Sequence, residues 1–336
     1  MLYGKKIVGL IFSVCFAVII SLTISPLVEA KTYVMRFGSP VEKPNIRNNI
    51  IRYMQKQLPR VTNGRVTVEG YFASIGGERE IMEMLILGTM DAYMGSTGPL
   101  SALTREPLAL IFDVPFLYKS WDHALYVGRG KIGQELNKRL IKKGIRILDF
   151  FAQAPRALYF RKTPVRKPAD LQGIKIRVME NPLYIAMYKE FGAIPTPMAW
   201  PEVYTSLQTG AIDGVDGALG SGLSAKHTEM VKYVTFLGPY MITNNILLLS
   251  EKWWQSLPDD LKQHVQSVAR EAAMYTTGRI LENLEQLKTE WINLGIKFTD
   301  VDREAFFALA KRIYPMVEEK IGKDVIQEII RMGEVK

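Results

Sequence analysis

Beyond its N-terminal segment the chain alternates strand and helix patterns, and this alternation restricts its fold more than any other feature. Short apolar segments predict strands at 33–37, 66–69 and 145–151. Between them lie stretches with apolar residues at helical spacing, one of which begins after Asn45, a suitable N-cap. Strands that alternate with helices are typical of α/β proteins, so we expect an α/β fold with mainly parallel sheets.

The same pattern repeats in the second half of the chain. Residues 174–178 alternate apolar and basic side chains and predict a strand. Asn181 and Pro182 suit the N-cap and first position of a helix, and Gly210 suits the end of a short helix over 202–209. No Gly/Ser-rich linker separates the two halves. We therefore expect two lobes that are joined by several crossings of the chain.

One predicted helix is too long for a single lobe. After Pro258 no proline occurs until beyond Asn293, and the only glycine in this stretch is Gly278. Such a helix is about 50 Å long, whereas a lobe of half this chain is about 35–40 Å across. We expect the helix to span both lobes and to bend near residues 276–278.

These patterns together predict a two-lobed clamshell that closes around a ligand. We expect one lobe to comprise residues 31–153 plus about 243–282. The other should comprise residues 154–242 plus about 283–336. The ligand cleft is expected between the two lobes.

The first 30 residues have the pattern of a signal peptide. Lys5 and Lys6 precede an uncharged apolar run, and small residues at positions 28 and 30 suit a signal peptidase. We expect cleavage before Lys31 and a periplasmic location. An uncleaved membrane anchor is the alternative, because about 20 apolar residues can span a bilayer. The polar and helix-breaking segment 21–26 favours cleavage.

Composition excludes several classes of function. The single cysteine, Cys15, lies in the expected signal peptide, so the mature chain offers neither thiol catalysis nor disulfides. The formal charge is +9, and removing two lysines and one glutamate gives 9 − 2 + 1 = +8. Basic residues gather over 156–177, but only Tyr159 and Phe160 are interleaved as aromatic platforms. We therefore expect small anions rather than nucleic acid as partners.

Several segments resemble one family of transport proteins. The most specific are 153–156 (QAPR), 167–178 (KPADLQGIKIRV), 180–182 (ENP), 192–198 (GAIPTPM), 202–210 (EVYTSLQTG) and 213–214 (DG). Supporting segments are 63–66 (NGRV), 75–80 (IGGERE), 88–91 (GTMD) and 113–117 (DVPFL). This series is similar to the solute-binding proteins of tripartite ATP-independent periplasmic (TRAP) transporters, of the dicarboxylate-binding type.

The resemblance implies a periplasmic receptor that binds an organic acid between its lobes. It would deliver the acid to a membrane permease driven by an ion gradient, and it is expected to be monomeric without a cofactor or metal. The alternative is a sensor that docks a receptor kinase, since its binding site would look the same. An exported enzyme is disfavoured: the dinucleotide-like pattern at 128–133 follows a predicted helix rather than a strand.

The resemblance also assigns ligand contacts. Arg177 would clamp the carboxylate, because a guanidinium matches it with two hydrogen bonds. Arg156 would assist, and Trp200 would lie over the ligand. Each has a plainer interpretation, as a surface arginine or a core tryptophan. Family members commonly have an asparagine after the Asp-Gly pair, and we expect Asp216 to replace that contact or the contact to be missing.

Four further residues are weaker candidates. Asn181 would contact the ligand or only cap its helix. Ser96 and Thr97 would donate hydroxyl groups or only form a turn, and Gln153 lies near an expected lobe crossing. Sugar-acid binders of the family place an acidic side chain near residues 95–98, where this chain has Gly-Ser-Thr-Gly. We therefore predict a small or more apolar acid rather than a hydroxyl-rich sugar acid.

Overall fold

The strands form two mixed sheets in a computed structural model that describes residues 31–238, 240–242 and 244–334. The first sheet has the order β2-β1-β3-β10-β4. Its strands are β1 (Tyr33–Ser39), β2 (Val66–Phe72), β3 (Ala92–Ser96), β4 (Ile145–Ala152) and β10 (Asn244–Ser250). The predicted signal peptide lies outside the described residues.

The second sheet has the order β11-β9-β5-β8-β6-β7. Its strands are β5 (Arg156–Phe160), β6 (Lys175–Val178), β7 (Ile194–Pro197), β8 (Gly214–Ala218), β9 (Tyr233–Thr235) and β11 (Lys297–Thr299). The α/β architecture is therefore confirmed, with one sheet in each predicted half of the chain. The residue bounds of the two lobes remain a prediction.

Most parallel pairs join strands that follow one another through helices, and β9 and β11 form one further parallel pair. β1 pairs with β2 and β3 in parallel, and β6 pairs with β7 and β8 in parallel. The strands β5 and β10, which follow chain segments running from one sheet to the other, pair antiparallel with their neighbours on both sides. A strand that enters a sheet from the other sheet needs no helical crossover, so it is free to run antiparallel.

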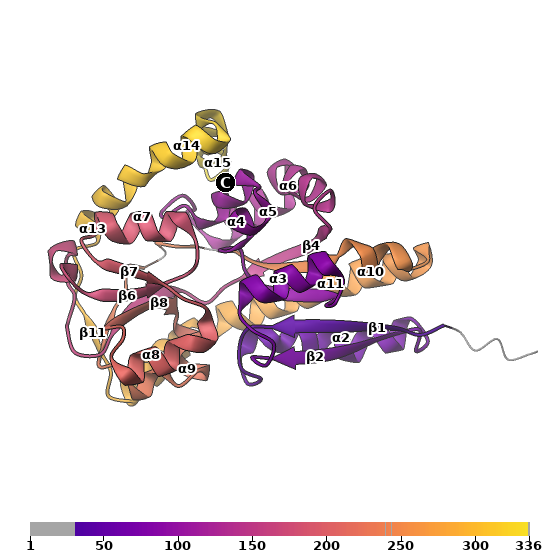
Figure 1. Ribbon diagram of the computed structural model, residues 1–336, viewed down its shortest axis with the longest axis horizontal. Helices are drawn as coiled ribbons and strands as arrows, with labels where there is room; N and C mark the ends of the chain where they lie inside the picture. The colour runs from indigo at the N-terminus through magenta and orange to yellow at the C-terminus, as the bar shows by residue number, and fades with distance from the viewer. Residues whose placement is uncertain (1–30, 239, 243, 335–336) are drawn as a thin grey trace, which may run out of the picture. The chain divides into compact units, whose positions relative to one another are not determined.

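Helices cover both sheets. The α-helices are α2 (Asn49–Val61), α3 (Glu78–Leu87), α4 (Leu100–Thr104), α5 (Trp121–Arg129), α6 (Lys131–Ile141), α7 (Pro182–Glu190), α8 (Val203–Thr209), α9 (Leu219–Ser224), α10 (Glu251–Ser256), α11 (Asp259–Glu282), α12 (Leu284–Asn293), α13 (Arg303–Ala310), α14 (Tyr314–Ile321) and α15 (Lys323–Met332). The short 3-10 helices are η1 (Ile46–Asn48), η2 (Pro107–Asp113), η3 (Pro168–Leu171), η4 (Trp200–Glu202), η5 (His227–Glu229) and η6 (Lys311–Ile313). Figure 1 shows α7 beside β6 and β7, with α13 next to α7, and α11 runs alongside α2.

The long helix breaks at a different place from the one predicted. Gly278 lies inside α11, and the chain turns at Asn283, whose amide bonds the Ile280 carbonyl in a 3-10 manner. The turn separates two packing faces: α11 packs against α2 and β4, whereas α12 packs against α9. Trp291 on α12 is fully buried and donates its indole N–H to the Leu219 carbonyl. Packing against two different sheets therefore sets the break, and glycine does not.

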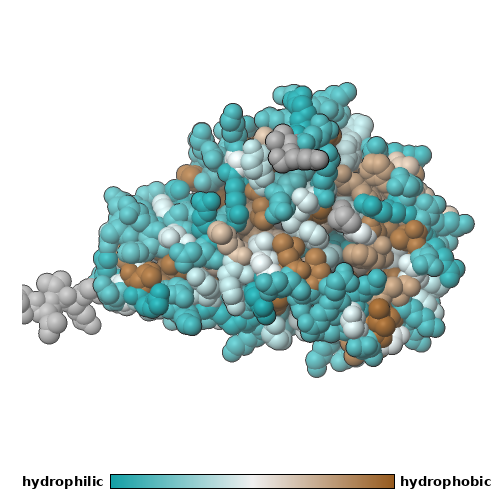
Figure 2. Space-filling model, turned by 180° about the vertical axis from the view of Figure 1, so that it is seen from behind, coloured by the Kyte–Doolittle hydropathy of each residue, from teal (hydrophilic) through white to brown (hydrophobic). Residues whose placement is uncertain are grey.

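Apolar side chains fill the interior between the sheets and their helices, with Trp291, Tyr93 and Tyr184 among the largest fully buried ones. Hydrophilic residues predominate on the face in Figure 2, where hydrophobic ones gather only in small groups. Within the described ranges, no helix is long and apolar enough to cross a bilayer.

Candidate ligand-binding site

Arg177 is a buried arginine that lacks an ion-pair partner in the described part of the chain. It lies on β6 between β7 and β8 and is only 2% exposed. Its Nε and Nη2 donate to the Met198 carbonyl at 3.0 and 2.8 Å, and Nη1 donates to the Asp216 carbonyl at 3.3 Å. Burial lowers the pKa of Arg177, and the carboxylate of Glu78 opposes that shift. Backbone carbonyls thus hold a positive charge in place without neutralising it.

Arg156 differs from Arg177 because it is neutralised. Its Nη2 lies 2.8 Å from Oδ1 of Asp216, and both side chains are buried. Tyr240 also donates its hydroxyl to that Oδ1 atom, at 2.9 Å. Burial works against the charged arginine and is the largest single effect, but the Asp216 carboxylate and the nearby tyrosines together outweigh it, and the pKa of Arg156 is raised. The Oδ2 atom of Asp216 is buried without a hydrogen-bond partner among the described atoms.

Trp200 forms an apolar wall beside Arg177. The Arg177 guanidinium carbon lies 5.2 Å from the centre of the indole ring, within the range of a cation–π contact. His227 packs on Trp200 at 4.8 Å between ring centres. Burial and the Arg177 charge lower the pKa of His227 to about 3, so its ring is neutral. The indole N–H is buried and unpaired in the described structure, and it could donate to a bound molecule.

Asn181 caps α7 and also forms hydrogen bonds with two residues that precede β4, Gly98 and Asp113. Its Oδ1 accepts from the Leu183 amide at 2.8 Å, as the capping interpretation predicts. Its Nδ2 donates to the Gly98 carbonyl at 3.0 Å and to Oδ2 of Asp113 at 3.1 Å. Thr97 donates its hydroxyl to the other oxygen of Asp113 at 3.1 Å. Burial raises the pKa of Asp113 to about 7.

Ser96 makes a second contact between the two halves. Its hydroxyl lies 3.1 Å from Oε1 of Glu78 and 3.3 Å from the Met179 sulfur. Glu78 lies at the start of α3, where a carboxylate is commonly solvated, but its side chain is only 9% exposed because α3 packs against β3. Gln153 is buried in the segment between β4 and β5, and its carbonyl accepts from the indole of Trp121 at 2.9 Å.

The sequence analysis missed three buried polar residues in this region, namely Arg47, Glu78 and Asp113. Glu78 and Asp113 lie within the family-like segments 75–80 and 113–117, so the family resemblance could have pointed to these two residues. Arg47 lies near the start of a helix and outside the segments that carry the family resemblance. Only its tertiary contacts reveal that it is buried.

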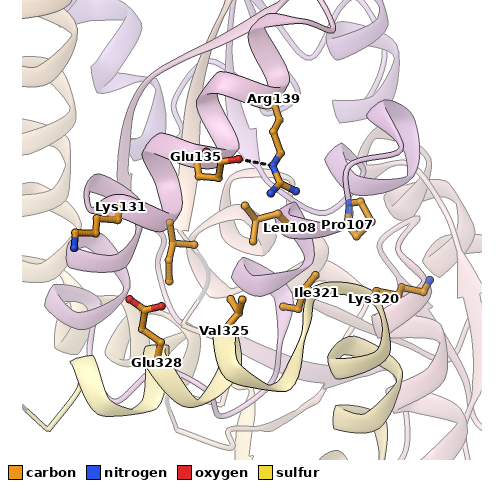
Figure 3. Close-up of a pocket in the computed structure, with 10 residues that line it drawn as sticks. Pro107, Leu108, Lys131, Glu135, Arg139, Lys320, Ile321, Val325 and Glu328 are labelled. Atoms are coloured by element: carbon orange, nitrogen blue, oxygen red, sulfur yellow. Dashed lines mark hydrogen bonds and ion pairs between the residues drawn. The ribbon is translucent and has the colours of Figure 1, made fainter.

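A cavity elsewhere on the molecule shares no residue with this cluster. It has a volume of about 330 Å³ and lies between η2, α6 and the helices α14 and α15. Figure 3 shows an apolar floor at Leu108, Ile321 and Val325, with the Glu135–Arg139 ion pair at its rim. No metal-ligand group of three or more His, Cys, Asp or Glu residues occurs in the part of the chain that the structure describes.

The model of the bacterial extracellular solute-binding protein family 7 (DctP) matches residues 38–320. The chain belongs to this family. Its members are solute-binding receptors, and the sequence resemblance to TRAP solute-binding proteins is thereby confirmed.

Three relatives illustrate how similar this family 7 protein is to known solute-binding proteins. A solute-binding protein of Verminephrobacter eiseniae is 34% identical over 82% of each chain. A TRAP periplasmic solute-binding protein of Roseobacter denitrificans, solved with L-galactonate, has a TM-score of 0.84 and 31% identity; the match covers 89% of this chain and 99% of that one. One of Sulfurospirillum deleyianum, solved with succinate, has a TM-score of 0.84 and 26% identity, covering 89% and 98%.

Proposed function

We propose that the mature protein is a periplasmic receptor that captures a small organic acid at Arg177 and delivers it to a TRAP-type permease. The cleft would lie between the two sheets, next to the buried cluster of Arg177, Arg156 and Trp200. Asn181, Ser96, Thr97, Asp216 and Gln153 would complete or support it. Residues 1–30 would serve as the cleaved signal peptide.

The unpaired charge of Arg177 is the observation that carries this proposal. A buried cation without a counter-ion is costly, so a protein keeps it where a ligand supplies the anion. The donors of a guanidinium match a carboxylate in geometry, and a planar aromatic wall at Trp200 would cover an apolar part of the ligand. The hydrogen bonds to Met198 and Asp216 fix the orientation of the guanidinium before a ligand arrives.

The ligands of the relatives agree with a carboxylate. L-galactonate and succinate differ in length and in hydroxyl content, and both carry a carboxylate. The Gly-Ser-Thr-Gly segment at 95–98 turns Ser96 and Thr97 toward protein carboxylates rather than presenting an acidic group of its own. A small acid with few hydroxyl groups therefore remains our prediction for this chain.

The proposal is tested by identifying what the protein carries when it is purified gently. Denaturation followed by mass spectrometry of the released small molecules should yield an organic acid. A thermal-shift screen should then show a higher melting temperature with that acid, because a ligand that binds only the native state stabilises it. Stabilisation by neutral sugars alone would contradict the proposal.

A further inference from the structure

We propose that an apolar cavity at the chain crossings between the two sheets binds a small neutral ring compound, and that this molecule holds the two halves closed. The cavity has a volume of about 160 Å³. None of its lining residues belongs to the candidate ligand-binding site around Arg177. Its regulatory role rests on the proposed function, in which the two halves close around an acid.

Three crossings of the chain line this cavity. Pro155 lies between β4 of the first sheet and β5 of the second. Phe236 directly follows β9, where the chain leaves the second sheet toward β10. Leu284 is the first residue of α12, directly after the turn that separates the packing faces of α11 and α12. The cavity therefore lies where the chain has to absorb any movement of one sheet relative to the other.

Side chains from both halves complete the walls of the cavity. Trp121 lies on α5, which packs against β4 and β10 of the first sheet, and its indole donates to the Gln153 carbonyl at 2.9 Å. Leu219 on α9 and Phe298 on β11 belong to the second sheet and its covering helices. The Leu219 amide donates to the Pro155 carbonyl at 3.1 Å. A change in the angle between the sheets would thus move Trp121 relative to Leu219 and Phe298 and alter the cavity.

The lining favours a neutral apolar occupant. Trp121, Phe236 and Phe298 are only half-buried, so their rings retain apolar surface that the protein itself does not cover. Glu285 and Lys288 are the charged residues of the lining, and their opposite charges leave it without net charge. An apolar cavity of about 150 Å³ takes up benzene. A compact, uncharged ring compound therefore matches this cavity in both size and polarity.

The structure has the closed arrangement of the two halves. Asn181, which follows β6 of the second sheet, donates to the carbonyl of Gly98, which follows β3 of the first. The Ser96 hydroxyl on β3 contacts the Met179 sulfur at 3.3 Å, and all three of Asn181, Ser96 and Met179 are buried. Opening the halves would break these contacts. The cavity is thus a feature of the closed arrangement, and a molecule that fills it stabilises that arrangement.

Occupation of the cavity is therefore coupled to capture of the acid. A molecule that favours closure raises the affinity for an acid that is held between the closed halves. By linkage, the acid raises the affinity of the cavity for its occupant by the same factor. The cavity is then a regulatory site, separate from the place where the acid binds.

Fluorine NMR with fluorobenzene, a neutral ring of about the size of benzene, tests binding. The wild type should bind it with a dissociation constant on the order of millimolar or lower. Leu284→Phe places a larger side chain in the cavity and should weaken binding about tenfold or more. Leu294→Phe is the matched control at an exposed position just after α12, and it should bind like the wild type. Failure of the wild type to bind, or wild-type affinity in Leu284→Phe, would overturn the inference.

Small-angle scattering with the same probe tests closure. Without any acid, fluorobenzene should reduce the radius of gyration of the wild type and of Leu294→Phe, and it should leave that of Leu284→Phe unchanged. An unchanged radius of the wild type at saturating fluorobenzene would overturn the role of the cavity in closure. If Leu284→Phe does not fold, Phe236→Trp, which enlarges a different lining side chain, replaces it in both experiments.

These measurements separate the inference from the proposed function, because neither uses an acid. Closure by fluorobenzene in a protein that binds no carboxylate would contradict the proposed function and still support the cavity as a control of closure. Capture of an acid without any response to fluorobenzene would overturn the role of the cavity alone.

Discussion

Asp216 neutralises Arg156 and at the same time orients Arg177. Its carboxylate forms a buried ion pair with Arg156 at 2.8 Å, and its backbone carbonyl accepts a hydrogen bond from Nη1 of Arg177 at 3.3 Å. One residue of β8 thus separates two neighbouring arginines into a paired one and an unpaired one. This division of roles explains how Arg177 can be kept free for an anion.

The first prediction concerns the stability of that pair. Asp216→Asn leaves Arg156 as a buried cation without a counter-ion, which should lower the free energy of unfolding by about 3–5 kcal/mol. Denaturant unfolding without ligand measures this loss. The exposed pair of Arg279 and Glu282 supplies the control, and Glu282→Gln should change stability little. Equal losses of unfolding free energy in the two variants would show that the buried pair stabilises the protein no more than the exposed pair does.

The second prediction concerns pH. The pKa of Asp113 is about 7 in the folded protein, above its ordinary value of 3.8. The folded state therefore holds a proton more tightly than the unfolded state, and this contribution to stability is fully present below pH 4 or so and is lost as the pH rises through about 7. Asp113→Asn should remove this dependence.

Chemical unfolding of wild type and Asp113→Asn at several pH values checks this. The stability of the wild type relative to the variant should fall between about pH 4 and pH 7 and level off above. Asp259→Asn is the control, because that side chain is exposed. A constant difference between wild type and Asp113→Asn over the whole range would refute the assignment.

The third prediction concerns closure of the two halves. Asn181→Ala removes both the cap of α7 and the hydrogen bond to the Gly98 carbonyl, so it should weaken ligand binding as well as stability. Small-angle scattering should show a smaller radius of gyration for ligand-bound wild type and a smaller change for the variant. Asp302→Ala removes only the cap of α13 and should leave the ligand response intact. An identical response in all three proteins would argue against Asn181 as a closing contact.

The fourth prediction concerns the aromatic wall. Trp200→Leu removes the ring that faces Arg177, and binding should weaken by about two- to thirtyfold. Trp200→Phe keeps an aromatic ring but loses the unpaired indole N–H, so its affinity should fall between those of wild type and Trp200→Leu. Titration calorimetry with the released acid measures both. Wild-type affinity in Trp200→Leu would show that Trp200 packs in the core and does not contact the ligand.

Local chemistry made part of the structure predictable. Asn181 before Pro182 can do little other than start a helix, and the structure confirms Asn181 as the cap. The alternation over 174–178 correctly predicted a strand, since it follows from the geometry of a strand itself. The position of the helix break did not follow, because Asn283 turns the chain only in response to the two surfaces that α11 and α12 cover.

The candidate site was predictable only where a family motif named the residue. Arg177 and Arg156 look alike in sequence, and only the position of Asp216 opposite β5 shows that one is neutralised. The burial of Glu78 and Arg47 could not be predicted from the sequence, because burial by a distant strand leaves no local pattern. Long-range packing therefore decides which charged groups of this chain lie inside.

The role of Arg177 as a carboxylate clamp is tested most directly by calorimetry on Arg177→Lys beside Arg166→Ala and Lys167→Ala. Lysine keeps the charge but loses the two-bond fork, and a broken buried contact costs about 2–5 kcal/mol, or roughly thirty- to several-thousand-fold in affinity. Arg166 and Lys167 are exposed members of the same basic segment, so their loss should change affinity much less. We predict a severe loss for Arg177→Lys alone. Wild-type affinity in Arg177→Lys, with equal weakening in the two alanine variants, would show that a diffuse positive field rather than a clamp binds the acid.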